Sequence, residues 1–293
     1  MDSQSNADHN FMDIFKEQSD YFTKFKKSSE YEAFVKTPVA YFCAEYALDS
    51  TLPTYAGGLG ILAGDYIREI GLQGFPLVAI GLRYQIGQNI LPVGESMENK
   101  MKKVVDENNQ DVMISVPIEH RTVNIKAWRW QENGARVYLL DTDIDENYPA
   151  DREITKYLYD NNRDIRLKQE MILGIGGFRL LAKLKYHSSV YHLNEGHSAF
   201  LALELIRHEM EHQHVNFKEA CEYAKKHVVF TNHTLALAGQ EQFASEKVNQ
   251  FIELCARDTC LKNEEISQLG TRSSDPNIFS MTTFSFRLSS KSN

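Results

Sequence analysis

The chain has 293 residues, of which 42% are hydrophobic and 25% are charged, proportions that are ordinary for a globular protein of one large domain or two smaller ones. Its formal net charge of −8 argues against nucleic acid as a partner, because binding a phosphate backbone needs a concentrated basic surface. No run reaches about 18 apolar residues, and the polar N-terminus lacks the features of a secretory signal, so the sequence predicts a cytoplasmic protein without a membrane partner.

The N-terminal part of the chain predicts a helical segment followed by an α/β pattern. Apolar residues at helical spacing among charges over 11–36 indicate one or two amphipathic helices within a helical segment 1–36. A strand is expected in PVAYFCAEY (38–46), a helix over 61–73 and a second, buried strand in FPLVAIGLRY (75–84). Between the first strand and the helix lies LPTYAGGLGILAGDY (52–66), which contains four glycines.

The middle of the chain differs in texture from the part that follows it. Residues 110–142 form β-rich runs, with QENGA as a turn between the last two, and predict a small antiparallel insertion. From residue 151 onward, helical and strand patterns alternate, which is typical of an α/β fold with a parallel, Rossmann-like sheet covered by helices. The expected helices span 151–159, 163–185, 198–212, 217–227 and 241–258, and the expected strands span 189–194 and 228–233.

The glycine-rich stretch raises the question of what approaches its backbone so closely. GLGILA (58–63) fits the dinucleotide pattern G-x-G-x-x-A, but that pattern should follow a strand directly, and here a loop precedes it. A general anion site fits better, because glycine N–H groups that lead into a helix N-terminus suit a phosphate. A tight loop without a ligand stays open as the alternative.

A second motif is HEMEH, which runs from His208 to His212 and matches the zinc-protease signature H-E-x-x-H. The apolar face of the expected helix includes Ala202, Ile206 and Met210. The two histidines lie about 200° around the helix from that face. We therefore expect both rings to point to solvent, and we expect no metal site.

The sequence contains four cysteines, Cys43, Cys221, Cys255 and Cys260. None of them belongs to a CxxC pair, the spacing that is typical of redox and metal sites. Reduced thiols in a cytosolic protein are therefore expected.

Polar side chains gather at the ends of two of the expected parallel strands. They are His192, Asn194, Glu195 and His197 after the first strand, and Thr231, Asn232, His233 and Thr234 after the second. Ligands bind at the carboxyl edge of open α/β sheets, so both clusters and the glycine loop are expected to form one cleft. A satisfied structural role is the alternative for any single histidine among them.

Long segments of the chain resemble the N-terminal half of bacterial α-glucan (glycogen, starch or maltodextrin) phosphorylases, over residues 36–288. In family order they are AYFCAEYALDSTLPTYAGGLGILAGDY, GFPLVAIGLRYQIGQ, VYLLDTDIDEN, REITKYLYDNNRDIRLKQEMILGIGGFRLL, HLNEGHSAF and FTNHT. The resemblance implies two Rossmann-like domains facing a deep cleft, the GT-B arrangement. It also implies cleavage of a terminal α-1,4-glucosidic bond by inorganic phosphate, which gives glucose 1-phosphate. This chain would supply the N-terminal domain, over 37–293, after the helical segment 1–36.

The resemblance also implies roles for individual residues. His233 would be the catalytic residue beside the glucosyl ring. The positions that bind substrate and phosphate would be Gly57, Gly58, Leu59, Tyr84, Asn194, Glu195, His197 and Asn232. Among them, the glycine loop would bring its amides to phosphate and sugar at a helix start.

The family's cofactor is pyridoxal phosphate, held by a lysine of the C-terminal domain that we expect to be absent from this chain. The resemblance stops before the polar tail SSKSN (289–293), so the chain is predicted to be truncated and inactive alone, with α-1,4-glucan and phosphate as the partners of the complete enzyme. Two alternatives stay open. The chain is one subunit of a split phosphorylase completed by a separate C-terminal-half chain, or it is a non-catalytic glucan-binding or regulatory remnant.

Overall fold

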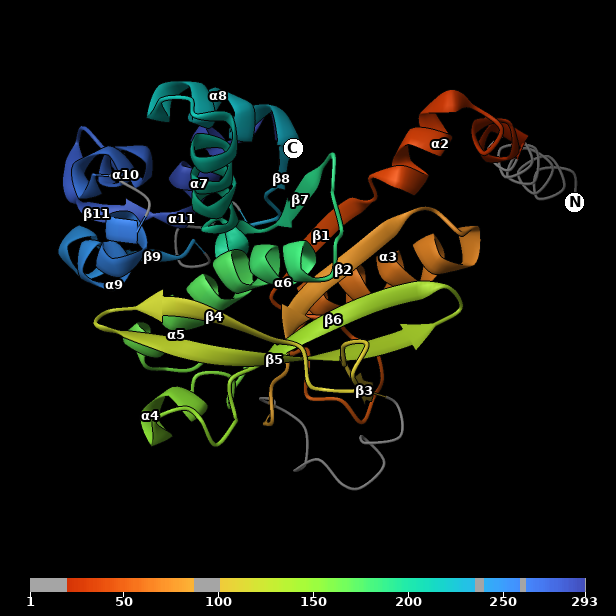
Figure 1. Ribbon diagram of the computed structural model, residues 1–293, viewed down its shortest axis with the longest axis horizontal. Coiled ribbons are helices and arrows are strands. Elements are labelled where there is room, and N and C mark those ends of the chain that lie inside the picture. The colour runs from red at the N-terminus through yellow and green to blue at the C-terminus, as the bar shows by residue number, and fades with distance from the viewer. Residues whose placement is uncertain (1–19, 87–100, 235–239, 259–261, 293) are drawn as a thin grey trace, which may run out of the picture.

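The computed structural model describes residues 20–86, 101–234, 240–258 and 262–292, and these are organised around a nine-stranded sheet (Figure 1). The strand order is β12-β8-β7-β1-β2-β6-β5-β3, with β4 beside β5. The strands from β12 through β6 run parallel to their neighbours, which confirms the predicted α/β class. The bounds of these strands are Val39–Cys43 for β1, Leu77–Leu82 for β2, Ala135–Asp141 for β6, Tyr191–Asn194 for β7, Val228–Thr231 for β8 and Lys291–Ser292 for β12.

The antiparallel run predicted over 110–142 lies at one end of this sheet. It consists of β4 (Met113–Ile118), β5 (Arg121–Glu132) and β6, and β3 (Met101–Lys103) also pairs with β5. The predicted turn between β5 and β6 contains Asn133 at φ 46° and Gly134 at φ 89°, the positive angles of an Asn-Gly hairpin turn. Because β6 is also parallel to β2, the antiparallel run extends the main sheet instead of lying apart from it.

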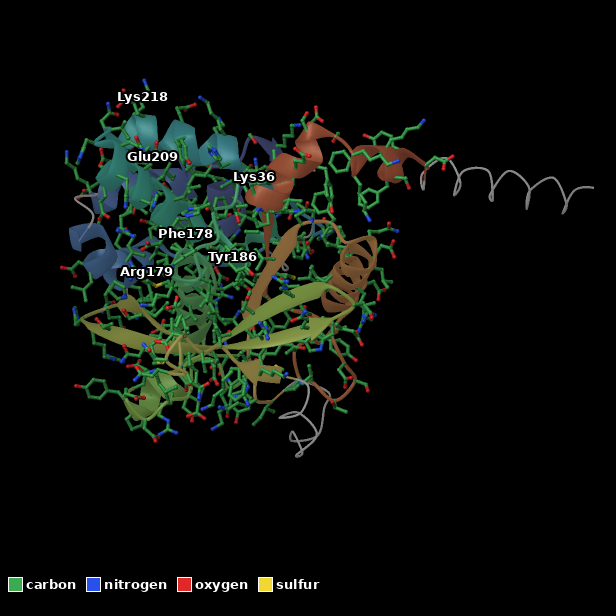
Figure 2. All side chains as sticks on the ribbon, turned by 45° about the vertical axis from the view of Figure 1, so that its right-hand side comes forward. Lys36, Phe178, Arg179, Tyr186, Glu209 and Lys218 are labelled. Carbon is green, nitrogen blue, oxygen red and sulfur yellow. The ribbon has the colours of Figure 1, made fainter. Side chains whose placement is uncertain are left out.

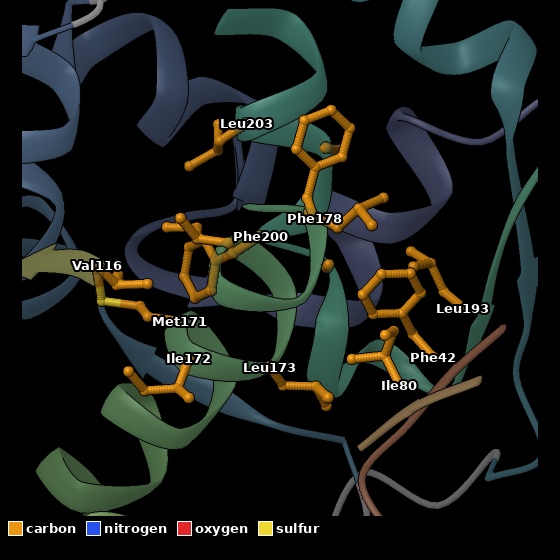
Figure 3. Close-up of a cluster of buried hydrophobic side chains, with 14 of the residues drawn as sticks. Phe42, Ile80, Val116, Met171, Ile172, Leu173, Phe178, Leu193, Phe200 and Leu203 are labelled. Atoms are coloured by element: carbon orange, nitrogen blue, oxygen red, sulfur yellow. The ribbon is translucent and has the colours of Figure 1, made fainter. Parts of the chain in front are cut away.

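Helices cover both faces of the parallel strands, and alternate side chains of each strand meet different helices. On one face, Tyr41 lies in the same apolar cluster as Ile67 of α3 (Gly58–Gln73). On the other face, Phe42 and Ile80 meet a long helical segment through Gly177, whose added Cβ would lie 2.5 Å from Phe42 (Figure 3). That segment was predicted as one helix and consists of α5 (Arg163–Met171), the π-helical turn η2 (Ile172–Gly176) and α6 (Gly177–Lys183). The predicted helices α7 (Leu201–Gln213) and α8 (Phe217–His227) follow β7.

A smaller antiparallel sheet, in the order β10-β11-β9, packs beside the main sheet and was not predicted. Phe279 of β11 and Phe284 of α11 both contact Phe200, with ring centroids 6.1 Å and 6.0 Å away. The elements of this region are β9 (Gln242–Ala244), α9 (Ser245–Asp258), α10 (Asn263–Gly270), β10 (Thr271–Arg272), β11 (Asp275–Ser280) and α11 (Met281–Arg287).

The helical segment expected at the N-terminus is represented by α2 (Ser29–Lys36), while residues 1–19 lie outside the described part. Ser28 caps α2 by accepting the N–H of Tyr31. Phe34 packs against Phe75, just before β2, in a tilted pair with ring centroids 5.5 Å apart, so the segment is attached to the main domain. None of the helices in the described part of the chain has the length and apolarity needed to cross a bilayer.

The prediction of a helix over 151–159 is wrong beyond its first residues. A single turn, α4 (Pro149–Arg152), forms, and the chain then bends away. The carbonyl of Lys156 accepts the N–H groups of Gln85 and Ile86, at 3.1 Å and 2.9 Å. Pairing with the segment that follows β2 has therefore overridden the local helical pattern.

Candidate active site

Three neighbouring parallel strands end at the same edge of the sheet. In the strand register, Cys43 of β1 lies opposite Asn194 of β7, which lies opposite Thr231 of β8. The loops that leave these strands carry Glu45, Glu195 and His233. The carboxyl edge therefore collects the side chains that the sequence predicted to meet there.

A cavity of about 520 Å³ opens at this edge, a size typical of small-molecule sites. Its lining residues are Gly58, Leu59, Leu62, Tyr159, Arg166, Glu195, His197, His233, Thr234 and Glu241. The structure thus brings Gly58 and Leu59 of the glycine loop together with Glu195, His197 and His233 of the two strand-end clusters.

The other predicted positions lie behind or beside the cavity. Asn194 is buried, donates from Nδ2 to Cys43 Sγ at 3.2 Å and accepts from the His233 ring. Tyr84 is buried and lines a small adjoining cavity with His197. Gly57 and Asn232 directly precede the lining residues Gly58 and His233. His192, also in the strand-end cluster, bonds to Thr231 Oγ1 at 2.9 Å, and burial lowers the pKa of its ring to about 4.

The four glycines of the glycine-rich stretch 52–66 divide into two kinds. A Cβ on Gly64 would lie 2.5 Å from the Ala47 carbonyl oxygen, and a Cβ on Gly60 would lie 2.4 Å from Cβ of Tyr55. At Gly57 and Gly58, an added Cβ would meet nothing within 4 Å. The fold therefore requires the later pair for close packing, whereas the earlier pair leaves open space at the cavity.

The first amides of the glycine loop already have an acceptor. Ala56 N–H and Gly57 N–H donate to Glu45 Oε2 at 2.7 Å and 3.2 Å. No side chain caps α3, and among the hydrogen bonds of the described residues none accounts for the N–H of Gly58 or Leu59. These two groups are thus unpaired donors in the first helical turn.

The histidine loop is held in a similar way by Glu195. Its Oε1 accepts the backbone N–H of His233 at 2.7 Å and of Thr234 at 3.0 Å. Glu195 itself has φ 67° and ψ 172°. The ring of His233 bonds through Nε2 to Asn194 Oδ1 at 2.6 Å. Because the Asn194 amide nitrogen already donates to Cys43, its Oδ1 is the acceptor and Nε2 of His233 is the donor in this contact, which leaves Nδ1 without that partner.

Sequence reasoning missed the cavity residues Tyr159, Arg166 and Glu241. Tyr159 donates from its hydroxyl to Glu45, and burial together with the Glu45 charge raises its pKa. The Arg166 guanidinium lies 5.1 Å from the centroid of the Tyr159 ring and pairs with Glu241. No local pattern singles these residues out, because distant elements bring them to the cavity.

Glu170 is a buried acid beside this site. It lines the small adjoining cavity, and neither of its carboxyl oxygens has a hydrogen-bond partner among the described residues. Burial raises the pKa of this carboxyl well above its usual value, against the lowering effect of Arg166 and Arg163. Burial also lowers the pKa of His197, in the same small cavity, to about 4, so burial favours the neutral form of both groups.

Glu170→Gln is expected to stabilise the protein more as the pH rises. The folded state keeps the Glu170 proton above the unfolded pKa of 4.5, so the wild type loses stability with rising pH, and glutamine does not titrate. The gain at pH 8 should be about 1 kcal/mol or more, and near zero at pH 4. Urea unfolding at the two pH values measures it. Glu204→Gln is the matched control, because buried Glu204 pairs with Arg179 and Arg207 and its loss should destabilise at both. A gain for Glu170→Gln that is equal at both pH values would contradict the neutral carboxyl.

Only one of the two HEMEH histidines is exposed, which corrects the expectation that both point to solvent. His208 is half-buried against Phe178 of α6, with ring centroids 5.8 Å apart, and Figure 2 shows Phe178 in its place on the ribbon. His212 is exposed and stacks on His208 at 4.1 Å. The buried face of α7 is therefore broader than its apolar residues alone indicate, and it includes the ring of His208. Within the described ranges, no group of three or more His, Cys, Asp or Glu side chains is arranged to hold a metal ion.

The two cysteines whose side chains are described are free thiols. Cys43 is buried, and burial raises its pKa to about 12. Cys221 is half-buried, with its pKa raised in the same way to about 12. The side chains of Cys255 and Cys260 lie outside the described residues. Neither described thiol has the lowered pKa of a reactive cysteine.

Comparison with known proteins gives a consistent result. No protein-family profile matches the chain. It is 39% identical over 269 residues to maltodextrin phosphorylase of Thermococcus litoralis, which covers 86% of this chain and 31% of that protein. It is 32% identical to glycogen phosphorylase of Mycobacterium tuberculosis, over 88% of this chain and 32% of that protein. It is also 32% identical to glycogen phosphorylase of Aquifex aeolicus, over 96% of this chain and 42% of that protein. The chain thus spans only 31–42% of the length of these relatives.

Proposed function

Because the chain belongs to the α-glucan phosphorylase family, we propose that it forms the N-terminal domain that binds glucan and phosphate in such an enzyme. The complete enzyme would cleave a terminal α-1,4-glucosidic bond with phosphate and give glucose 1-phosphate. The domain would span residues 37–293, after the helical segment 1–36. One observation carries the proposal, namely that residues from three distant predicted segments line a single cavity.

In this proposal the phosphate lies at the start of α3. The unpaired N–H groups of Gly58 and Leu59 point from the first helical turn, where the helix dipole favours negative charge. The open space at Gly57 and Gly58 allows an oxyanion to approach the backbone closely. A phosphate held there would be the nucleophile that replaces the glucan at the anomeric carbon.

His233 would contact the glucosyl ring, with its loop held by Glu195. Its Nε2 is committed to Asn194, which leaves backbone groups and Nδ1 for the sugar. Positioned acceptors of this kind stabilise positive charge that develops on the ring in the transition state. His197 would form part of the pocket wall around it, with Asn232 beside the pocket and Tyr84 behind it in the adjoining small cavity.

Pyridoxal phosphate would supply proton transfer to the substrate phosphate in the complete enzyme. The lining residues that the structure describes include no lysine, so they do not fit a cofactor held as a Schiff base. Their one arginine, Arg166, already pairs with Glu241. We therefore assign the cofactor, its lysine and the opposing cations to the rest of the enzyme.

The chain alone is expected to give no glucose 1-phosphate from glycogen, phosphate and pyridoxal phosphate. The physical reason is that preorganised charge opposite the glycine loop is typically the largest contribution to catalysis, and the described lining does not supply it. A coupled assay with the purified chain measures this. Product above a blank without protein would refute the assignment of the cofactor to another part of the enzyme.

A specific surface favours completion by further polypeptide, on the same or a separate chain. The side chains of Ile61, Leu62 and Tyr66 on α3 are 51%, 47% and 37% exposed, and Leu62 also lines the cavity. Exposed apolar groups at the rim of a site are typical of an interaction surface. Addition of a C-terminal-half chain should then restore activity to the assay above. A non-catalytic remnant would instead bind maltooligosaccharides without gaining activity, which calorimetry with both chains distinguishes.

A further inference from the structure

Glu45 occupies an unusual place for a carboxylate. It follows β1, is only 3% exposed, and lies beside the start of α3, where the proposed phosphate would bind. Its Oε2 accepts the N–H groups of Ala56 and Gly57, and its Oε1 accepts the Tyr159 hydroxyl. Because one side chain accepts all three hydrogen bonds, it fixes the two amides and the hydroxyl relative to one another.

The glycine loop has few other restraints. Gly57 and Gly58 have open space in place of side-chain packing, and no side chain caps α3. Two successive glycines carry more conformational freedom than any other pair of residues. Something must fix their orientation if the next two amides are to face the cavity.

The opposite wall of the cavity uses the same device. Glu195 accepts the two successive backbone N–H groups of His233 and Thr234, as Glu45 accepts those of Ala56 and Gly57. Both glutamates follow the carboxyl ends of neighbouring strands, β1 and β7. The two loops that meet at the cavity are therefore each tied to the rigid sheet by a carboxylate.

We propose that Glu45 is the positioning residue of the glycine loop. By binding the amides of Ala56 and Gly57, it turns the N–H groups of Gly58 and Leu59 toward the cavity, and Tyr159 keeps its second oxygen in place. The inference rests on the proposed function in taking phosphate as the ligand. A negative charge beside the proposed phosphate site repels an anion, so the carboxylate would help binding through its geometry and not through its charge.

Two substitutions separate geometry from charge. Glu45→Asp keeps the charge but shortens the side chain by one methylene, so its carboxylate cannot reach both amides and Tyr159 together. Glu45→Gln keeps the length and an acceptor oxygen but removes the charge. A positioning role predicts that the aspartate variant is impaired and the glutamine variant is not. If the charge itself held the loop, the glutamine variant would be impaired and the aspartate variant would not.

The experiment is an NMR titration of the labelled full chain with inorganic phosphate, together with amide hydrogen exchange. In Glu45→Asp, exchange at Ala56 and Gly57 should be about tenfold faster or more, and phosphate should bind about tenfold more weakly. In Glu45→Gln, both quantities should stay within about threefold of the wild type. The matched control is Glu219→Asp, because Glu219 also accepts a backbone N–H, that of Asn216, in the capping box of α8. It should change neither quantity.

Each outcome decides the role of Glu45. Unchanged exchange and binding in Glu45→Asp would overturn it, and so would a defect that appears only in Glu45→Gln. If Glu45→Asp does not fold, Tyr159→Phe serves instead, and unchanged exchange at Gly57 in that variant would also overturn it. If the wild type shows no phosphate-dependent shifts at Gly58 and Leu59, the proposed phosphate site fails, while the exchange at Ala56 and Gly57 still tests Glu45.

Discussion

Replacement of Phe200 by alanine is expected to destabilise the protein by about 3–5 kcal/mol. Phe200 is fully buried, and its ring stacks on Phe279 of the small sheet and contacts Phe284 of α11. Figure 3 shows it between the helical segment that carries Met171 and the start of α7. Loss of the ring leaves a cavity between the start of α7 and the small sheet with α11, and the surrounding elements cannot close it fully.

Urea unfolding measures this effect, and Phe286→Ala is the matched control. Phe286 is 45% exposed and contacts Phe230 through a single edge-to-face pair at 5.0 Å. Its loss should cost only about 1 kcal/mol. Similar costs for the two substitutions would show that the contacts of Phe200 with Phe279 and Phe284 do not stabilise the fold as expected.

Gly64→Ala and Gly58→Ala are expected to have opposite effects. A Cβ on Gly64 would lie 2.5 Å from the Ala47 carbonyl oxygen and 2.9 Å from its carbon, and backbone atoms cannot move aside easily. The resulting strain should cost about 1–3 kcal/mol or more. At Gly58 a Cβ meets no atom within 4 Å, and alanine suits a helix better than glycine, so stability should stay equal or rise by up to about 1 kcal/mol.

Phosphate binding should follow the other order. A methyl group at Gly58 projects into the space that an oxyanion would occupy, so binding should weaken by roughly tenfold or more. The folded fraction of Gly64→Ala should still bind phosphate, because a side chain at residue 64 faces the Ala47 backbone and not the cavity. Thermal unfolding and phosphate titration of both variants give the comparison. Undiminished binding by Gly58→Ala would place the phosphate elsewhere.

The periodic part of the fold was predictable because its patterns are local. The parallel strands β1, β2, β7 and β8 and the helices between them arise from apolar runs and helical spacing that each segment carries by itself. The meeting of the glycine loop with His197 and His233 was also predictable, since parallel strands place their carboxyl ends at one edge. The Asn-Gly turn between β5 and β6 belongs to the same class.

What the sequence could not give depends on contacts between distant segments. The predicted helix over 151–159 stops early because the Lys156 carbonyl pairs with the chain after β2. That change of direction brings Tyr159 to the cavity. The sequence around Tyr159 contains no pattern that predicts this position. The occupation of the Ala56 and Gly57 amides by Glu45 joins residues that are 11 and 12 positions apart, so the loop looked more open in sequence than it is.

The backbone of Glu195, which holds the histidine loop at the cavity, is conformationally strained. With φ 67° and ψ 172°, it lies in a region that is occupied almost only by glycine, at an expense of about 1–3 kcal/mol. Glycine at this position would relax that strain and release the histidine loop together with it. Stability and the ordering of the histidine loop therefore oppose each other at one residue, and the most stable version of this domain would hold His233 less firmly at the cavity.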